Sequence, residues 1–169
     1  MKHRSAGFTL IELITTVTVV GVLLSLAIPS FRETIDNNRL VGANNDFVSA
    51  LNYARSEALK RSNAVTLCSS TDGASCAAST TWSTGWIAFG DTNANGSLDG
   101  AETVIQAWPA TETNFALTSN RDFVRYASTG VSSAAATFGL LKTGCTGNHA
   151  RQITITVTGR IRTAVVACP

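Results

Sequence analysis

Histidine is nearly absent from this chain, which has only His3 and His149 among its 169 residues. Serine and cysteine nucleophiles are commonly activated by a neighbouring histidine that acts as a base. The sequence offers no readable Ser–His–carboxylate or Cys–His arrangement, and no paired-carboxylate site can be located in it. We therefore do not expect this protein to be an enzyme.

Acidic residues are missing from the last part of the chain. No Asp or Glu follows Asp122, whereas five basic residues do: Arg125, Lys142, Arg151, Arg160 and Arg162. The formal net charge is only +2, so the overall charge gives no reason to expect nucleic-acid binding. The locally basic C-terminal region does give one, because contacts to phosphate supply most of the sequence-independent affinity for DNA.

Charged side chains are almost absent from residues 8–28, where Glu12 is the one exception. The rest of this run is apolar or carries hydroxyl groups, and about 20 such residues span the core of a bilayer as a helix. A short basic segment ending at Gly7 precedes the run. An ordinary secretory signal is cut after its apolar run. A cut between Gly7 and Phe8 would instead leave the membrane segment in the mature protein.

The string GFTLIE at residues 7–12 closely resembles the signal of type IV pilins and type II secretion pseudopilins. The resemblance implies that a prepilin peptidase removes residues 1–7 and methylates the new N-terminus at Phe8. It also implies that Glu12 pairs with the N-terminal amine of a neighbouring subunit during assembly. A carboxylate in lipid is costly unless it finds a partner, although Glu12 could instead lie close enough to the interface to stay hydrated. Without the two basic residues of the leader, eleven basic and eleven acidic side chains remain.

Helical spacing continues beyond the apolar run. Pro29 should kink the helix, because proline removes one backbone donor. Apolar residues then recur at i+3, i+4 and i+7 up to residue 61. They form one face, made of Leu40, Ala43, Phe47, Ala50, Leu51, Ala54 and Ala58. We expect a membrane-spanning half at residues 8–28 and an amphipathic outer half at residues 29–62.

Residues 63–169 carry the pattern of an antiparallel β domain. Short segments rich in β-branched or aromatic residues are bounded by clusters of Gly, Asn, Ser and Thr. They are residues 64–68, 85–89, 103–108, 115–117, 122–126 and 152–158. The last of these alternates Ile153, Ile155 and Val157 with polar residues, as a half-buried strand does. We therefore predict an α+β fold, a long N-terminal helix packed on an antiparallel sheet.

The whole pattern resembles the H-type branch of the pilin superfamily, which includes the secretion pseudopilin GspH and the minor pilins FimT and FimU. The stretches that carry this second resemblance are FVSALNYARSEALKRSNAVTLC and GWIAFGDTNANGSLDGAE, together with GRIR near the C-terminus. Among these relatives the chain looks most like a FimT-type minor pilin.

Four cysteines in a chain with an export signal suggest two disulfides, for which three connectivities exist. We favour Cys68–Cys76, which closes a small loop, and Cys145–Cys168, which would hold the C-terminus. The cysteine spacings do not resemble a zinc site.

Residues 91–102 fit the twelve-residue pattern of a calcium loop. Its possible oxygen ligands are Asp91, Asn93, Asn95, Asp99 and Glu102. The flanking segments read as strands rather than as the helices of an EF-hand, and runs of Asn and Gly make good β-turns without metal. We favour a hairpin loop over a calcium site, and expect no cofactor.

Residues 158–163 read TGRIRT and are the sharpest functional candidate. In an extended segment Arg160 and Arg162 project to the same side, and Gly159 permits a turn that presents them. Two such guanidiniums can each engage a phosphate through bidentate hydrogen bonds. The string resembles the GRxR motif of FimT-type pilins, which implies DNA binding in natural transformation. Arg151 and Lys142 could extend the patch.

A charged, solvated hairpin end is the plain alternative for this segment, because similar strings occur in relatives without a DNA role. Trp82, Trp86 and Trp108 could stack on bases, but tryptophan in a small β domain usually packs in the core. We expect core packing.

These resemblances imply a minor pilin of a type IV pilus that captures double-stranded DNA. The alternative is a structural minor pseudopilin of a type II secretion system without DNA binding. Expected partners are other pilins or pseudopilins, the prepilin peptidase and double-stranded DNA. The expected location is the bacterial inner membrane, as a single-pass protein with a periplasmic C-terminal domain. After assembly the protein would lie in an extracellular or periplasmic filament.

Overall fold

The computed structural model describes residues 7–100 and 102–169, with the side chains of residues 26–30 excepted. The predicted leader, residues 1–7, therefore lies outside the described residues except for Gly7. The chain divides after Asn38 into an N-terminal helical unit and a compact unit, Arg39–Pro169. The compact unit begins within the helix rather than at residue 63, because the helix buries side chains from Leu40 onward in the core.

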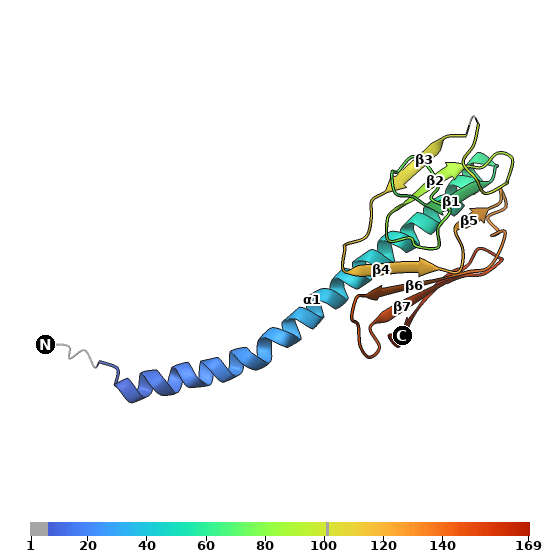
Figure 1. Cartoon of the computed structure of the whole chain (residues 1–169). Helices are drawn as coiled ribbons and strands as arrows, with labels where there is room; N and C mark the ends of the chain where they lie inside the picture. Colours follow the sequence, from blue (N-terminus) through green and yellow to red (C-terminus); the bar gives the residue numbers. More distant parts are fainter. Residues whose placement is uncertain (1–6, 101) are drawn as a thin grey trace, which may run out of the picture. The chain divides into compact units, whose positions relative to one another are not determined.

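One long helix, α1 (Leu10–Arg61), contributes to both units (Figure 1). The hydroxyl of Thr9 accepts a hydrogen bond from the backbone N–H of Glu12 at 3.3 Å, which caps the start of the helix. Lys60 and Arg61 lie in the last turn, where the helix dipole favours positive charge. Ser62 follows in the left-handed conformation, with φ of 52°. The predicted helix is confirmed, and it ends at the expected residue.

The N-terminal unit exposes its large apolar side chains, among them Leu10, Val17 and Leu24. The kink expected at Pro29 and the end of the expected membrane segment both fall on residues 26–30. The backbone of these residues is helical, but their side chains lie outside the described part of the chain.

Within the residues that the structure describes, no helix combines the length and the apolar character needed to cross a membrane.

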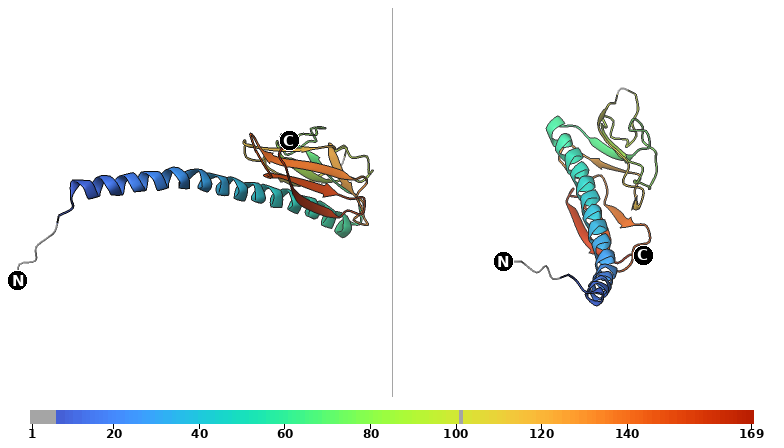
Figure 2. Two further views of the ribbon diagram at one scale, coloured as in Figure 1. Left: turned by 90° about the horizontal axis from the view of Figure 1, so that it is seen from below. Right: turned by 90° about the vertical axis from the view of Figure 1, so that its left-hand side faces the viewer.

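The compact unit contains two antiparallel four-stranded sheets instead of the single sheet that we expected. The first has the order β3 (Val104–Trp108), β2 (Trp86–Gly90), β1 (Val65–Ser69), β5 (Phe123–Tyr126). The second has the order β4 (Phe115–Ser119), β6 (Ala136–Lys142), β7 (Ala150–Ile155), β8 (Ile161–Val166). The C-terminal half of α1 lies against both sheets (Figure 2).

Strands β6 and β8 were not predicted, and β7 is shifted from its expected range. Strand β6 has Gly139 at its centre, and glycine weakens the strand signal. Strand β8 lies at the edge of its sheet and is mostly exposed, so it shows no alternation of apolar residues. Strand β7 ends at Ile155 because a turn follows it, which leaves Val157 exposed rather than in the core.

Phe47 of α1 lies at the centre of the core. Its ring contacts those of Trp82, Trp86 and Phe138, with centroid distances of 5.7, 5.0 and 4.7 Å. Trp82 and Trp86 are buried, and Trp108 packs partly buried against the same core. The tryptophans therefore pack in the core or against it, as expected. Such aromatic contacts add stability beyond the burial of area.

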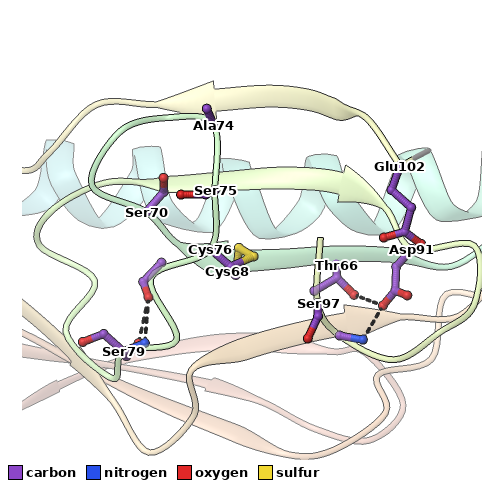
Figure 3. Close-up of a disulfide and its surroundings, with 12 residues drawn as sticks. Thr66, Cys68, Ser70, Ala74, Ser75, Cys76, Ser79, Asp91, Ser97 and Glu102 are labelled. Carbon is purple, nitrogen blue, oxygen red and sulfur yellow. Dashed lines mark hydrogen bonds between the residues drawn. A yellow bond between two sulfur atoms is a disulfide. The ribbon is translucent and has the colours of Figure 1, made fainter. Parts of the chain in front are cut away.

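Both favoured disulfides are formed. Cys68 of β1 is bonded to Cys76, which closes the loop after that strand (Figure 3). Cys145, after β6, is bonded to Cys168, and so holds the C-terminal segment beside the β6–β7 loop. A backbone hydrogen bond from Cys168 to the carbonyl of Gly147 supports the second link.

Candidate nucleic-acid interface

The segment with the two candidate arginines forms the hairpin between β7 and β8. Thr154 of β7 lies opposite Arg162 of β8, and the backbone N–H of Thr156 donates to the carbonyl of Arg160 at 3.0 Å. The register thus continues by one pair beyond the strand ends. Side chains that alternate by two residues along a strand lie on one face of a sheet. Arg160 and Arg162 therefore lie on the same face, next to Thr154 and Thr156.

Thr156 organises the turn of this hairpin. Its carbonyl accepts from the N–H of Gly159 at 2.8 Å, and its hydroxyl accepts from the N–H of Arg160 at 3.2 Å. The same hydroxyl lies 2.8 Å from that of Thr158. Threonine hydroxyls commonly close turns in this way. The turn is fixed by several hydrogen bonds, so it presents the arginines on a defined backbone.

Gly159 is required by the packing of the turn against the segment after β5. It is buried and has a left-handed φ of +76°, and a Cβ at this position would lie 2.2 Å from the carbonyl oxygen of Gly130. The backbone N–H of Ser132 donates to the carbonyl of Val157 at 3.0 Å. The glycine therefore serves a close backbone approach in addition to the turn that we expected.

Arg55 of α1 joins these two turns to the helix. Its Nε donates to the carbonyl of Gly130 at 2.8 Å, and its Nη2 donates to the carbonyl of Thr158 at 3.3 Å. This role could not be predicted from sequence, because Arg55 lies 103 residues from Thr158 and only the fold brings them together.

The side chains of Arg160 and Arg162 are exposed. In the described part of the chain, neither guanidinium has a hydrogen-bond or ion-pair partner. Both retain their five donors for a ligand, and the planar arrangement of these donors matches the oxygens of a phosphate.

Arg151 does not join this pair. It is buried, at 9% exposure, and lies on the same face of β7 as the core residues Ile153 and Ile155. The extension of the patch to Arg151 is therefore wrong, because the pleat of β7 turns this side chain away from the face of Arg162.

Lys142 lies at the opposite end of its sheet. Arg162 is paired with Thr154 of β7, which is paired in turn with Thr137 of β6. Lys142 lies five residues beyond Thr137, at the end of β6. That spacing corresponds to roughly 17 Å along a strand. Nearness in sequence suggested Lys142, but the strand direction takes it away from the arginine pair.

The possible calcium ligands lie in the loop between β2 and β3, which are antiparallel neighbours. The prediction of a hairpin loop is therefore confirmed. Asp91 is fully buried, and its Oδ2 accepts from the hydroxyl of Thr66 at 2.6 Å (Figure 3). The same oxygen accepts from the N–H of Gly96 at 2.9 Å. Its Oδ1 accepts from the N–H of Asn95 at 3.0 Å. This carboxylate holds the loop onto β1.

The other carboxylates of the loop also accept hydrogen bonds from within it. Asp99 accepts from the side-chain amides of Asn95 and Asn93. Glu102 accepts from the backbone N–H of Thr92 at 2.7 Å. No group of three or more His, Cys, Asp or Glu side chains arranged to hold a metal occurs among the described residues.

The residues of the N-terminal signal lie at the start of the described chain. Phe8 is 87% exposed, and Glu12 is exposed in the first turn of α1. Among the described residues other than its neighbours in the chain, none has an atom within 4 Å of the position that a Cβ on Gly7 would take.

Two family models match the chain. The one described as type II transport protein GspH matches residues 43–159. The other, described as the prokaryotic N-terminal methylation motif, matches residues 2–28. None of the curated proteins compared with the chain matches it significantly.

Solved structures with a similar fold come from two bacteria. The type IV minor pilin FimU of Pseudomonas aeruginosa is 21% identical, with a TM-score of 0.61, and the match covers 76% of this chain and 90% of FimU. A second crystal form of FimU gives 20% identity and a TM-score of 0.56, over 73% of this chain and 90% of FimU. The minor pseudopilin EpsH from the type 2 secretion system of Vibrio cholerae is 12% identical, with a TM-score of 0.51, over 73% of this chain and 94% of EpsH. At these identities the similarity establishes the α+β pilin-like fold.

Proposed function

The chain belongs to the GspH family of minor pilins and pseudopilins, and from this premise we propose that it is a minor pilin of a type IV pilus that binds double-stranded DNA. Members of the wider pilin family assemble with other pilins into filaments. The DNA contact is made by Arg160 and Arg162. The observation that carries this proposal is the pair of exposed guanidiniums, without partners in the described chain, on one face of a hairpin fixed by hydrogen bonds.

The N-terminal segment determines how the protein reaches the filament. The methylation motif at residues 2–28 supports cleavage between Gly7 and Phe8 by a prepilin peptidase. Before assembly the protein is anchored in the inner membrane by residues 8–28, with its C-terminal domain in the periplasm. During assembly Glu12 pairs with the N-terminal amine of a neighbour, which removes an isolated carboxylate from lipid. The protein acts by assembly and binding and carries out no catalysis.

Electrostatics favours phosphate as the ligand of the hairpin. The last acidic residue of the chain is Asp122, so no carboxylate side chain follows it in sequence to neutralise the arginines locally. Each guanidinium can form two charge-assisted hydrogen bonds with one phosphate. One domain makes few such contacts, so its affinity is low, and several copies in a filament would raise it by avidity.

A gel-shift titration of the full chain in detergent with a DNA duplex tests the DNA proposal. We expect the double variant Arg160→Gln/Arg162→Gln to bind at least about a hundredfold more weakly, because each charge-assisted contact contributes about 1.5 kcal/mol or more. The matched control is Arg32→Gln/Arg121→Gln, which removes two exposed arginines elsewhere and should bind within about twofold of wild type. Equal affinity of the double variant and wild type refutes the assignment.

A structural pseudopilin of a type II secretion system is the second candidate, favoured by the description of the matching family. This role predicts no shift of DNA by the wild-type protein even at low salt. It also predicts binding to other pseudopilins that changes little with salt. The genes adjacent to this one, for pilus assembly or for secretion, would distinguish the two systems.

A further inference from the structure

We infer that Arg55 is a positioning residue for the DNA-binding arginine pair, holding the β7–β8 turn to helix α1 without contacting DNA itself. This inference rests on the proposed DNA-binding function. It assigns a role to a helix residue that is far in sequence from Arg160 and Arg162 but contacts the turn that precedes them.

Three separate elements meet at the guanidinium of Arg55. The side chain comes from α1, Gly130 belongs to the turn after β5, and Thr158 belongs to the β7–β8 turn. Nε and Nη2 each donate to a different carbonyl, at 2.8 and 3.3 Å. Without Arg55, the two turns would be connected to each other by the backbone hydrogen bond from Ser132 to Val157, and this link to the helix would be lost.

Two glycines leave the space that the guanidinium of Arg55 occupies. A Cβ on Gly159 would lie 3.1 Å from Nε of Arg55, and a Cβ on Gly130 would lie 3.3 Å from the same atom. Both glycines have a positive φ. The guanidinium thus reaches the two carbonyls because neither turn carries a side chain at this point.

The chemistry of arginine suits this position better than that of lysine. A guanidinium is planar and donates in several fixed directions, so one side chain can bridge two carbonyls that lie on different segments. A lysine ammonium is a compact and strongly hydrated charge, and holding two acceptors costs it more side-chain freedom. We therefore expect lysine to replace Arg55 only in part.

Positioning raises affinity by lowering the entropy lost on binding. Arg160 follows Gly159 directly, so its direction depends on how firmly the turn is held. A flexible loop must be ordered when the ligand binds, whereas a fixed one has already paid that cost. The donors of Arg55 that point at Gly130 and Thr158 are engaged within the protein, which distinguishes this residue from the two exposed arginines.

The variants Arg55→Met and Arg55→Lys test the inference in the full chain in detergent. Methionine keeps an apolar stem and removes all donors. The matched control is Lys60→Met, which removes one positive charge from the same helix at a side chain that is 77% exposed. Two quantities are measured: the affinity for a DNA duplex as a function of salt, and the hydrogen-exchange protection of the amides of Arg160 and Ser132.

We expect Arg55→Met to weaken DNA binding roughly fivefold, Arg55→Lys to weaken it less, and Lys60→Met to leave it nearly unchanged. The slope of log K against log salt should stay at the wild-type value in Arg55→Met, because Arg160 and Arg162 still make the phosphate contacts. Protection of the two amides should fall in Arg55→Met and not in Lys60→Met, while the melting temperature shows whether the domain is still folded.

Three results overturn the inference, and each has a different meaning. If wild type binds no DNA, the proposed function fails, and the positioning role fails with it. If wild type binds and Arg55→Met binds equally well, the proposed function stands and the positioning role is wrong. If Arg55→Met binds DNA more weakly and also lowers the magnitude of the slope of log K against log salt by about 0.9, Arg55 itself contacts a phosphate.

Discussion

The substitution Gly159→Ala should destabilise the compact unit more than the same substitution at a turn glycine where the new Cβ would meet no other atom. The new Cβ would lie 2.2 Å from the carbonyl oxygen of Gly130, a backbone atom that cannot move without shifting its turn. The φ of +76° adds a second cost, since a side chain in the left-handed region is strained by about 1–2 kcal/mol.

Gly144→Ala separates these two costs. Gly144 has a similar φ of +72°, but nothing lies within 4 Å of its Cβ position. Gly144→Ala should therefore lose only the free energy of the strained backbone, about 1–2 kcal/mol. Gly159→Ala should lose that term and a steric term of about 1–3 kcal/mol, the usual range for overpacking. We expect Gly159→Ala to lose about 2–5 kcal/mol in total.

Urea denaturation of the two variants and wild type, followed by circular dichroism, measures the difference. Each kcal/mol corresponds to roughly 3–5 °C in melting temperature for a domain of this size, so thermal unfolding gives a second reading. If Gly159→Ala and Gly144→Ala are equally stable, the close approach between Gly159 and Gly130 does not exist, and the account of the hairpin is wrong.

Two further predictions concern the loops. Asp72 accepts from the hydroxyl of Ser75 and from the N–H groups of Ala74 and Ser75, and these hydrogen bonds hold its pKa in the folded protein well below its usual value of 3.8. The ionised carboxylate therefore stabilises the fold above about pH 4, and the stability advantage of wild type over Asp72→Asn in urea titrations should shrink as the pH falls below that value. A difference that stays constant from pH 6 to 2.5 contradicts this prediction. The disulfide Cys145–Cys168 closes a sequence separation of 23 residues, so Cys145→Ser/Cys168→Ser should cost about 3 kcal/mol in the same assay, and a loss below about 0.5 kcal/mol would show that the link does not constrain the unfolded chain.

The sequence allowed the helix to be predicted because its signals are local. The periodicity of Leu40, Phe47 and Leu51 reports one buried face, and α1 buries these residues. The start of the helix at Thr9 and its end near Arg61 also depend on neighbouring residues. The four cysteines could be paired correctly because each bond connects residues close in the chain.

The sheets were harder to predict because their organisation depends on contacts between distant residues. Nothing local tells that β5 joins β1 while β4 joins β6. The edge strand β8 lacks an alternating pattern of apolar and polar residues because most of its side chains are exposed to solvent. The same reason explains the errors at the candidate site. Proximity in sequence suggested Arg151 and Lys142, whereas the pleat and the strand direction place them elsewhere, and Arg55 comes from the helix.

The measurement that tests the central claim most directly is the salt dependence of DNA binding by wild type and by the single variants Arg160→Gln and Arg162→Gln. If each guanidinium contacts one phosphate, each variant should lower the magnitude of the slope of log K against log salt by about 0.9, and the double variant by about twice that amount. A slope that stays at the wild-type value in both single variants, or a wild-type protein that does not bind DNA at low salt, contradicts the claim.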